Sequence, residues 1–214
     1  MNGPLADLLH DVAAGRYPPP DGSVTIVPQP SPRDAGVISL TAHSVIFTDA
    51  DPSWVRDQLP AGDLSGPLMP PFLQAVCAKT GRRVNNIDML CVTMSLPGRP
   101  SVMLSRSGPV SHPRIERALR YRDDILAWEA PGGIVLLARG VAGRWEVAVE
   151  VDPDYRGKGL GRELAAAARH LVPAGTPLWA QIAPGNAASV RAFLAAGYQP
   201  VGAEALLPMA RPAH

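Results

Sequence analysis

The chain has 214 residues, of which 46% are hydrophobic and 18% are charged, and its formal net charge is +1. This composition is typical of a globular protein, and the length suits one large domain or two small ones. The balanced charge argues against nucleic-acid binding by phosphate neutralisation, and no apolar run approaches the roughly 20 residues that span a membrane.

The first hundred residues are expected to form an α/β lobe. Its predicted elements, in chain order, are strands at 24–27 and 37–47, helices at 49–59 and 70–80, and a strand at 86–94. Asp51 and Pro52 suit the N-cap and first position of the first helix, and Gly81 suits the end of the second. Residues 1–20 are amphipathic and end in three consecutive prolines, which indicates an extended or loosely attached arm.

The chain after residue 100 has a sharper pattern. Its predicted elements are strands at 101–106, 124–130, 133–141, 144–151, 178–183 and 199–207, and helices starting near residues 113, 160 and 187. Short turns at 131–133 and 142–143 join three of the strands, which predicts an antiparallel meander. The order of elements predicts an α/β domain on a mixed sheet.

The most informative segment is a glycine-rich turn between the strand that ends at Val151 and the following helix. Gly157, Gly159 and Gly161 allow positive φ angles and close approach of a ligand to the backbone. The first N–H groups of a helix lack internal partners, and the helix dipole favours an anion there. Strand, turn and helix together predict a phosphate cradle, to which Arg156, Lys158 and Arg162 add positive charge.

Two nucleotide-binding loops do not fit this segment. A P-loop requires GxxxxGK[ST], which is absent. A dinucleotide fingerprint requires GxGxxG and an acidic residue about 20 positions later. Here the spacing is GxGxG, and no acidic residue lies between Glu163 and Glu204. A tight turn that binds no ligand is the remaining alternative.

The run Arg156-Gly157-Lys158-Gly159-Leu160-Gly161 resembles the R/Q-x-x-G-x-G/A signature of the GNAT superfamily of N-acetyltransferases. Residues 184–202 are similar to the N-x-x-S/A-x-x-x-Y-x-x-x-G-F/Y segment that closes that fold. The resemblance covers residues 101–214. It implies a GNAT-like domain there, an antiparallel meander followed by βαβ, with residues 1–100 as an added N-terminal α/β lobe of unknown role.

The resemblance also implies a function and a set of cofactor contacts. The expected activity is transfer of an acetyl group from acetyl-CoA to an amine acceptor. By analogy with the family, the residues of the turn that would bind the pyrophosphate are Arg156, Gly157, Lys158, Gly159, Leu160, Gly161 and Arg162. The strand from Val149 to Val151 would pair with the pantetheine arm. Asn186 and Ser189 match polar cofactor contacts, although Asn186 equally suits a helix N-cap.

The acid–base residues depart from the family pattern. Phe193 occupies the place of the frequent tyrosine general acid, Gln181 occupies the place of a glutamate base, and Tyr198 falls at a packing position. Glu146 and Glu150, on one face of the predicted strand 144–151, are the candidate general bases. The alternative for each is an exposed polar strand position.

These departures leave other functions open. A non-catalytic acyl-CoA-binding or interaction module is the alternative to the enzyme, and a scaffold without cofactor affinity is the third hypothesis. The sequence leaves the acceptor and the oligomeric state open. The expected partners are acetyl-CoA and an unidentified amine, without nucleic acid or membrane.

The remaining titratable residues form no recognisable site. Cys77 and Cys91 are too few for a disulfide framework and wrongly spaced for zinc, and the five histidines lack metal-ligand spacing, so we expect no metal. The N-terminus lacks signal-peptide features, so we expect a cytoplasmic location. The residues Arg114, Arg117, Arg120 and Arg122 are expected to form a solvated basic helix face or to attract an anion.

Overall fold

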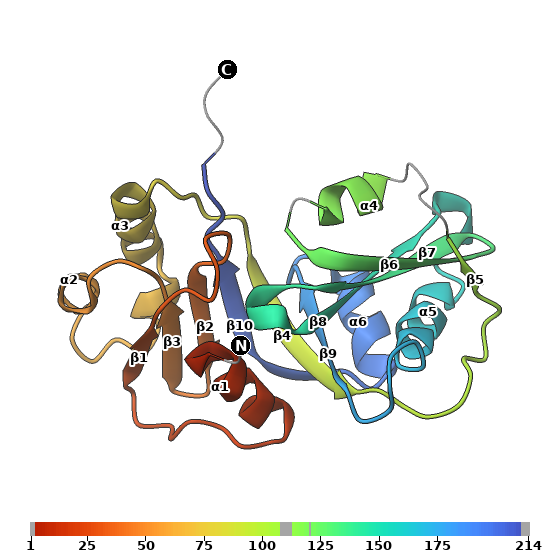
Figure 1. Cartoon of the computed structure of the whole chain (residues 1–214), viewed down its shortest axis with the longest axis horizontal. Helices are drawn as coiled ribbons and strands as arrows, with labels where there is room; N and C mark the ends of the chain where they lie inside the picture. The colour runs from red at the N-terminus through yellow and green to blue at the C-terminus, as the bar shows by residue number, and fades with distance from the viewer. Residues whose placement is uncertain (1–2, 108–112, 120, 211–214) are drawn as a thin grey trace. The chain divides into compact units, whose positions relative to one another are not determined.

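The computed structural model describes residues 3–107, 113–119 and 121–210. It confirms the predicted α/β class with a mixed sheet (Figure 1). Two compact units are present: unit 1 comprises Met1–Met89 and Val201–His214, and unit 2 comprises Leu90–Pro200. Each boundary between the units falls within a strand, Ile87–Met94 or Gln199–Leu206.

The described residues of unit 1 form helices and a sheet. Its helices are α1 (Pro4–Ala13), α2 (Pro52–Asp57) and α3 (Pro70–Thr80), and its strands are β1 (Val24–Val27), β2 (Gly36–Leu40), β3 (His43–Phe47) and most of β10 (Gln199–Leu206). The strand order is β1-β3-β2-β10. Strand β1 runs parallel to β3, whereas β2 is antiparallel to both β3 and β10. A short 3-10 helix, Gly66–Leu68, precedes α3.

The predicted ends of α2 and α3 are confirmed. The Asp51 carboxylate caps α2 by accepting hydrogen bonds from the backbone N–H groups of Ser53 and Trp54. Helix α3 ends at Gly81, whose φ of 68° lies in the left-handed region that glycine adopts easily.

Two predictions for this unit were wrong. The segment predicted as an extended arm contains helix α1, because Leu5, Leu9 and Val12 recur at helical spacing and are buried. The apolar run 37–47 forms two strands, β2 and β3, because the chain reverses at Ala42, whose φ is 49°.

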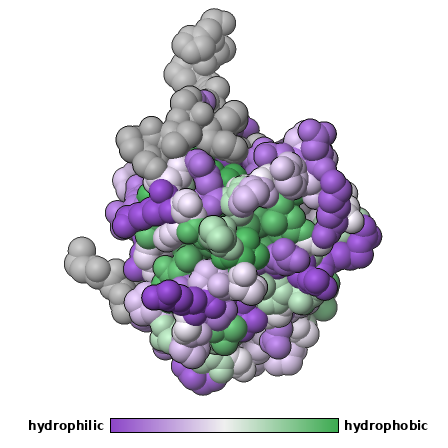
Figure 2. Space-filling view, turned by 90° about the vertical axis from the view of Figure 1, so that its right-hand side faces the viewer, coloured by the Kyte–Doolittle hydropathy of each residue, from purple (hydrophilic) through white to green (hydrophobic). Residues whose placement is uncertain are grey.

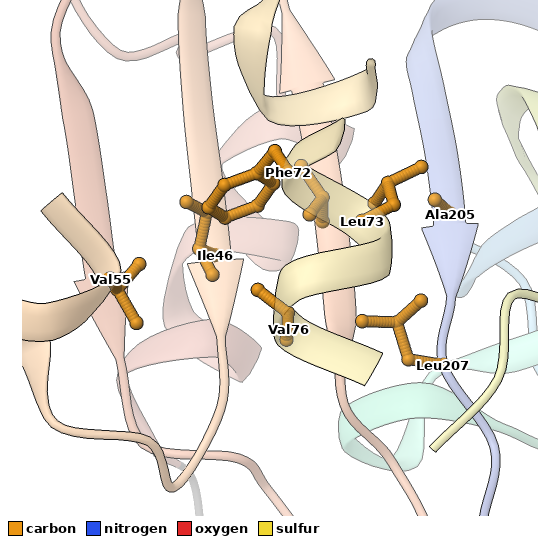
Figure 3. Packing of buried hydrophobic residues seen from close by; sticks show 8 residues of the cluster. Ile46, Val55, Phe72, Leu73, Val76, Ala205 and Leu207 are labelled. Carbon is orange, nitrogen blue, oxygen red and sulfur yellow. The ribbon is translucent and has the colours of Figure 1, made fainter. Parts of the chain in front are cut away.

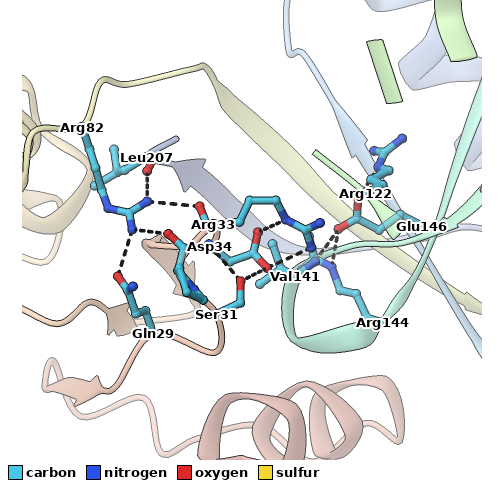
Figure 4. Close-up of polar contacts among 11 residues, drawn as sticks. Gln29, Ser31, Arg33, Asp34, Arg82, Arg122, Val141, Arg144, Glu146 and Leu207 are labelled. Carbon is cyan, nitrogen blue, oxygen red and sulfur yellow. Dashed lines mark hydrogen bonds and ion pairs between the residues drawn. The ribbon is translucent and has the colours of Figure 1, made fainter. Parts of the chain in front are cut away.

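The core of unit 1 lies between α2, α3 and the sheet (Figure 3). Its buried members are Val37, Ile46, Val55, Phe72, Leu73, Val76, Ala205 and Leu207. A buried arginine, Arg82, ties the adjoining loops together (Figure 4). Its guanidinium donates to the carbonyl oxygens of Arg33, Pro32 and Leu207 and to Gln29 Oε1. The guanidinium of Arg82 therefore has hydrogen-bond acceptors within the protein, and we assign Arg82 a structural role.

Unit 2 contains the predicted meander and the two helices that follow it. Its strands are most of β4 (Ile87–Met94), β5 (Ser105–Arg106), β6 (Asp123–Ala130), β7 (Gly133–Arg139), β8 (Trp145–Val151) and β9 (Pro177–Ile182), in the order β4-β9-β8-β7-β6-β5. Its helices are α4 (Pro113–Ala118), α5 (Leu160–Ala168) and α6 (Ala187–Ala195), with 3-10 turns at Val141–Gly143 and Pro153–Tyr155. The strand predicted at 101–106 is reduced to the two-residue edge strand β5.

The two faces of the unit 2 sheet are covered differently. Ile134 and Leu136 of β7 pack with Ala118 of α4 on one face. Helices α5 and α6 lie on the other face (Figure 1), where the side chain of Leu164 approaches Gly133. Strand β7 is therefore buried on both sides, as its continuous apolar run predicts.

The surface of this part of the molecule has mixed polarity. Figure 2, which shows the right-hand side of Figure 1 face-on, has an apolar area surrounded by hydrophilic residues. Apolar atoms make up a large share of most protein surfaces, so the area alone identifies no partner. Among the described residues, no helix is long and apolar enough to cross a membrane.

Candidate functional site

Strands β8 and β9 run parallel but pair over a short stretch. Trp145 lies opposite Leu178 and Glu146 lies opposite Trp179. Strand β8 continues to Val151, and β9 continues to Ile182. All residues of both strands are described, and none after Glu146 in β8 is paired with β9. The strands therefore diverge, and we call the space between residues 147–151 and 180–182 the fork.

The backbone of β8 presents alternate residues to the fork. Along the antiparallel β7–β8 ladder, Gly140 N donates to Arg144 O and Asp152 N donates to Gly132 O. Hydrogen-bonded pairs in such a ladder recur every second residue. The even-numbered residues of β8 therefore bond to β7, while Val149 and Val151 direct their N–H and C=O groups toward the fork.

Two cationic side chains contact these outward groups. Arg114 Nη2 of α4 donates to Val149 O at 2.9 Å. Arg156 Nε donates to Val151 O at 3.1 Å, from the turn that follows the strand. Both contacts agree with the direction that the ladder gives to the carbonyl groups.

The glycine-rich turn leads into an uncapped helix. Gly157 and Gly159 have φ angles of 75° and 93°, so both take the left-handed conformation. Gly159 is the N-cap of α5, and within the described residues no side chain caps this end. Arg162 N and Glu163 N donate to Gly159 O, so the amides before them have no acceptor within the helix. The turn therefore presents backbone donors in an exposed segment.

The turn lies against the end of β8 and against α6. A Cβ atom placed on Gly161 would lie 3.6 Å from Val151 Cγ2 and 3.8 Å from Ala192 Cβ. At the start of α6, Asn186 Oδ1 accepts a hydrogen bond from Ser189 N at 3.1 Å. The N-cap role of Asn186 is confirmed, whereas a cofactor contact by Asn186 or Ser189 stays a prediction.

The two candidate bases have different surroundings. Glu150 is half-buried, with its side chain 42% exposed, and its Oε2 lies 3.3 Å from Arg114 Nε. Glu146 is 2% exposed. Its carboxylate accepts hydrogen bonds from Arg122 Nε at 2.7 Å and Arg144 Nε at 2.9 Å (Figure 4). The structure thus places one glutamate at the open end of the fork and the other inside an ion-pair cluster at its base.

The charge state of Glu146 follows from this cluster. Burial by itself raises the pKa of Glu146, but the guanidinium groups of Arg144 and Arg122 outweigh burial and hold the pKa below its ordinary value. Glu146 is therefore an ionised carboxylate whose two oxygens both accept hydrogen bonds.

The aromatic residues near α6 pack in the core. Phe193 is buried and meets the Tyr198 ring edge-on, with centroids 4.9 Å apart. The Tyr198 hydroxyl donates to Ala165 O at 3.3 Å, and burial raises the pKa of this phenol. The packing role predicted for Tyr198 is confirmed.

Residues 118–198 match the model of the acetyltransferase (GNAT) family. These residues form a GNAT-family domain. The match contains β6 to β9, the turn, α5 and α6, and therefore both sides of the fork. The GNAT family implies acyl-CoA-dependent acyl transfer to an acceptor. No curated protein matches the chain.

Three solved structures are similar to the chain at low identity. A GCN5-related N-acetyltransferase from Kribbella flavida has 20% identity and a TM-score of 0.43, and the match covers 67% of this chain and 65% of that protein. A putative GNAT-family acetyltransferase from Novosphingobium aromaticivorans has 20% identity and a TM-score of 0.39, over 61% and 69% of the two chains. A tandem GNAT protein from the clavulanic acid biosynthesis pathway has 16% identity and a TM-score of 0.40, over 85% and 66%.

The arginine contacts in the GNAT domain were not predicted from the sequence. The expected solvated face is wrong for Arg114 and Arg122, which pair with Glu150 and Glu146. Arg120 and the side chain of Arg117 lie outside the described residues. Arg144 was overlooked, although its spacing of two from Glu146 places both side chains on one face of an extended segment. Among the described residues, no group of three or more His, Cys, Asp or Glu could hold a metal.

Proposed function

We propose that the chain is an acetyl-CoA-dependent N-acetyltransferase that transfers the acetyl group to an amine. The observation that carries this proposal is the fork: β8 leaves β9 after Glu146 and ends beside an uncapped helix with a glycine turn. A strand edge with outward amides can pair with an extended chain, and an uncapped helix start can bind phosphate.

The chemistry of the turn fits the anionic end of acetyl-CoA. A Cβ atom on Gly157 would meet no neighbouring atom, so glycine is needed there for its positive φ and not for lack of space. The backbone donors from Arg156 to Arg162 would hold the pyrophosphate, with Arg156, Lys158 and Arg162 providing opposite charge. The outward groups of Val149 and Val151 would hold the pantetheine arm. Asn186 and Ser189 would contribute from the start of α6.

The residues of the fork also have functional groups that amine acylation needs. When bound, acetyl-CoA supplies a thioester carbonyl that an amine can attack. Glu150, half-exposed at the open end of the fork, would receive the proton that the amine loses, directly or through water. The N–H groups of β8 that face the fork are suitable donors for a negatively charged oxygen.

The lack of a hydroxyl at Phe193 and the burial of Tyr198 favour a second candidate, a non-catalytic acyl-CoA-binding module. Both candidates predict binding of acetyl-CoA, and they differ in turnover. Release of free thiol from acetyl-CoA in the presence of amines supports the enzyme, and binding without release supports the module.

Calorimetric titration with acetyl-CoA tests the proposal. Wild type is expected to bind at micromolar concentration, and Gly159→Glu is expected to lose binding because it adds a negative charge where the pyrophosphate would lie. Gly175→Glu is the matched control: Gly175 also has a positive φ, 81°, and open space, but precedes β9 outside the turn. Absence of binding by folded wild type, or equal loss in both variants, would refute the assignment.

A further inference from the structure

Four side chains form one connected polar cluster where β8 and β9 diverge. We call Arg122, Arg144, Glu146 and Gln181 the fork cluster. Arg122, directly before β6, donates through Nε to Glu146 Oε2 at 2.7 Å and through Nη2 to Gln181 Oε1 at 3.1 Å. A single guanidinium therefore connects a side chain of β8 with a side chain of β9.

The position of this bridge coincides with the end of the backbone ladder. Glu146 and Trp179 are the last paired residues of β8 and β9. Because side chains alternate along a strand, Gln181 lies on the same face of β9 as Trp179, two residues further along the strand and within the fork. Arg122 thus links the strands at the first position where backbone pairing has ended.

The cluster has little freedom to rearrange. The side chains of Glu146 and Arg144 are each 3% exposed. The Arg144 guanidinium lies 5.3 Å from the ring centroid of Trp179, which adds a second connection between the strands. A Cβ on Gly140 would lie 2.2 Å from Glu146 Cδ, so the carboxylate rests directly against the backbone.

We propose that Glu146 and Arg122 are positioning residues that fix the separation of β8 and β9 in the fork, and that Glu146 is not the general base. Each Glu146 oxygen already accepts a hydrogen bond from a guanidinium, and the side chain is only 3% exposed. A base needs an accessible oxygen within reach of the substrate proton. What enters the fork rests on the proposed function, whereas the bridge itself does not.

Two substitutions of Arg122 distinguish the effect of its positive charge from the effect of its two simultaneous hydrogen bonds. Arg122→Lys keeps a cation beside Glu146, but one ammonium cannot span both acceptors as the Nε and Nη2 groups of arginine do. Arg122→Met removes both contacts. Arg106→Gln, an exposed arginine on β5, is the control.

The first measurement is hydrogen exchange of residues 177–182 in the protein without ligand. Both Arg122 variants are expected to exchange faster than wild type in this segment, and the control is expected to match wild type. The second measurement is the Kd for acetyl-CoA, expected to rise about tenfold in both variants because small displacements of a binding edge have large effects. The pH profile of thiol release is expected to keep its shape.

Several results would overturn the positioning role. Unchanged exchange in folded Arg122→Met refutes the bridge, and faster exchange with an unchanged Kd refutes its control of binding. A pH profile that loses its acidic limb in Glu146→Gln while the Kd stays constant identifies Glu146 as the base instead. If Arg122→Met does not fold, Gln181→Ala removes the β9 acceptor alone and is expected to give the same exchange. Failure of wild type to bind acetyl-CoA refutes the proposed function, but the exchange result still decides the bridge.

Discussion

Replacing Glu146 with glutamine is expected to destabilise the protein strongly at neutral pH. The substitution keeps the size of the side chain but removes the negative charge between Arg122 and Arg144, whose contacts with the carboxylate are 2.7 and 2.9 Å long. Removal of one partner from a buried ion pair costs about 3–5 kcal/mol. At about 2–4 °C per kcal/mol for a chain of this length, the melting temperature is expected to fall by about 6–20 °C.

The effect is expected to depend on pH in a defined direction. The pKa of Glu146 in the folded protein lies below its ordinary value of 4.5. A carboxyl with a depressed folded pKa stabilises the fold above its unfolded pKa, and this contribution is lost as the pH falls through the folded pKa. The difference between wild type and Glu146→Gln is therefore expected to be complete at pH 7 and to shrink below about pH 4.5.

Thermal unfolding followed by circular dichroism between pH 3.5 and pH 8 measures both effects. Glu129→Gln is the control, because Glu129 is exposed on β6 and accepts one hydrogen bond from Ser107. Its expected effect is within about 0.5 kcal/mol. If Glu146→Gln melts with the control at pH 7, or if its deficit is the same at all pH values, the ion-pair argument is refuted.

Three smaller effects follow from single contacts. Arg114→Ala is expected to strengthen acetyl-CoA binding by up to about fivefold, because it frees Val149 O at the fork. Calorimetry measures this change, and weaker binding would show that Arg114 holds the ligand. Tyr198→Phe is expected to lower the free energy of unfolding in urea by about 1 kcal/mol and to leave thiol release unchanged, because among the described contacts the hydroxyl bonds only to Ala165 O. Loss of thiol release would contradict the packing role. Asp51→Ala is expected to lower the free energy of unfolding by about 1 kcal/mol through loss of the α2 cap. A urea unfolding curve identical to that of wild type would contradict this capping role.

The local features of the fold were predictable because they depend on residues close in sequence. The ends of α2 and α3, the meander, and the left-handed glycines of the turn each follow from capping or turn chemistry within a few residues. Helix α1 was not predicted, because the three prolines after it favour an extended arm, although its apolar spacing is helical. The sequence therefore contains the helical pattern of α1, but the prolines that follow it indicate an extended chain.

The pairing of distant residues was beyond sequence reasoning. Arg122 and Gln181 are 59 positions apart, and their contact depends on where β9 is inserted beside β8. The assignment of β10 to unit 1 depends likewise on its pairing with β2, far earlier in the chain. Sequence periodicity gives the face on which a side chain lies, but it does not give the partner across the sheet.

The position of each glutamate along β8 accounts for its different chemistry. Glu146 and Glu150 lie on the same face of one strand, four residues apart, so periodicity cannot distinguish them. The strands are still paired at Glu146, which is buried and contacts two guanidinium groups. They have separated at Glu150, where one partly exposed arginine remains. Where the strands stop pairing, two equivalent sequence positions therefore become a buried, ion-paired carboxylate and a partly exposed one.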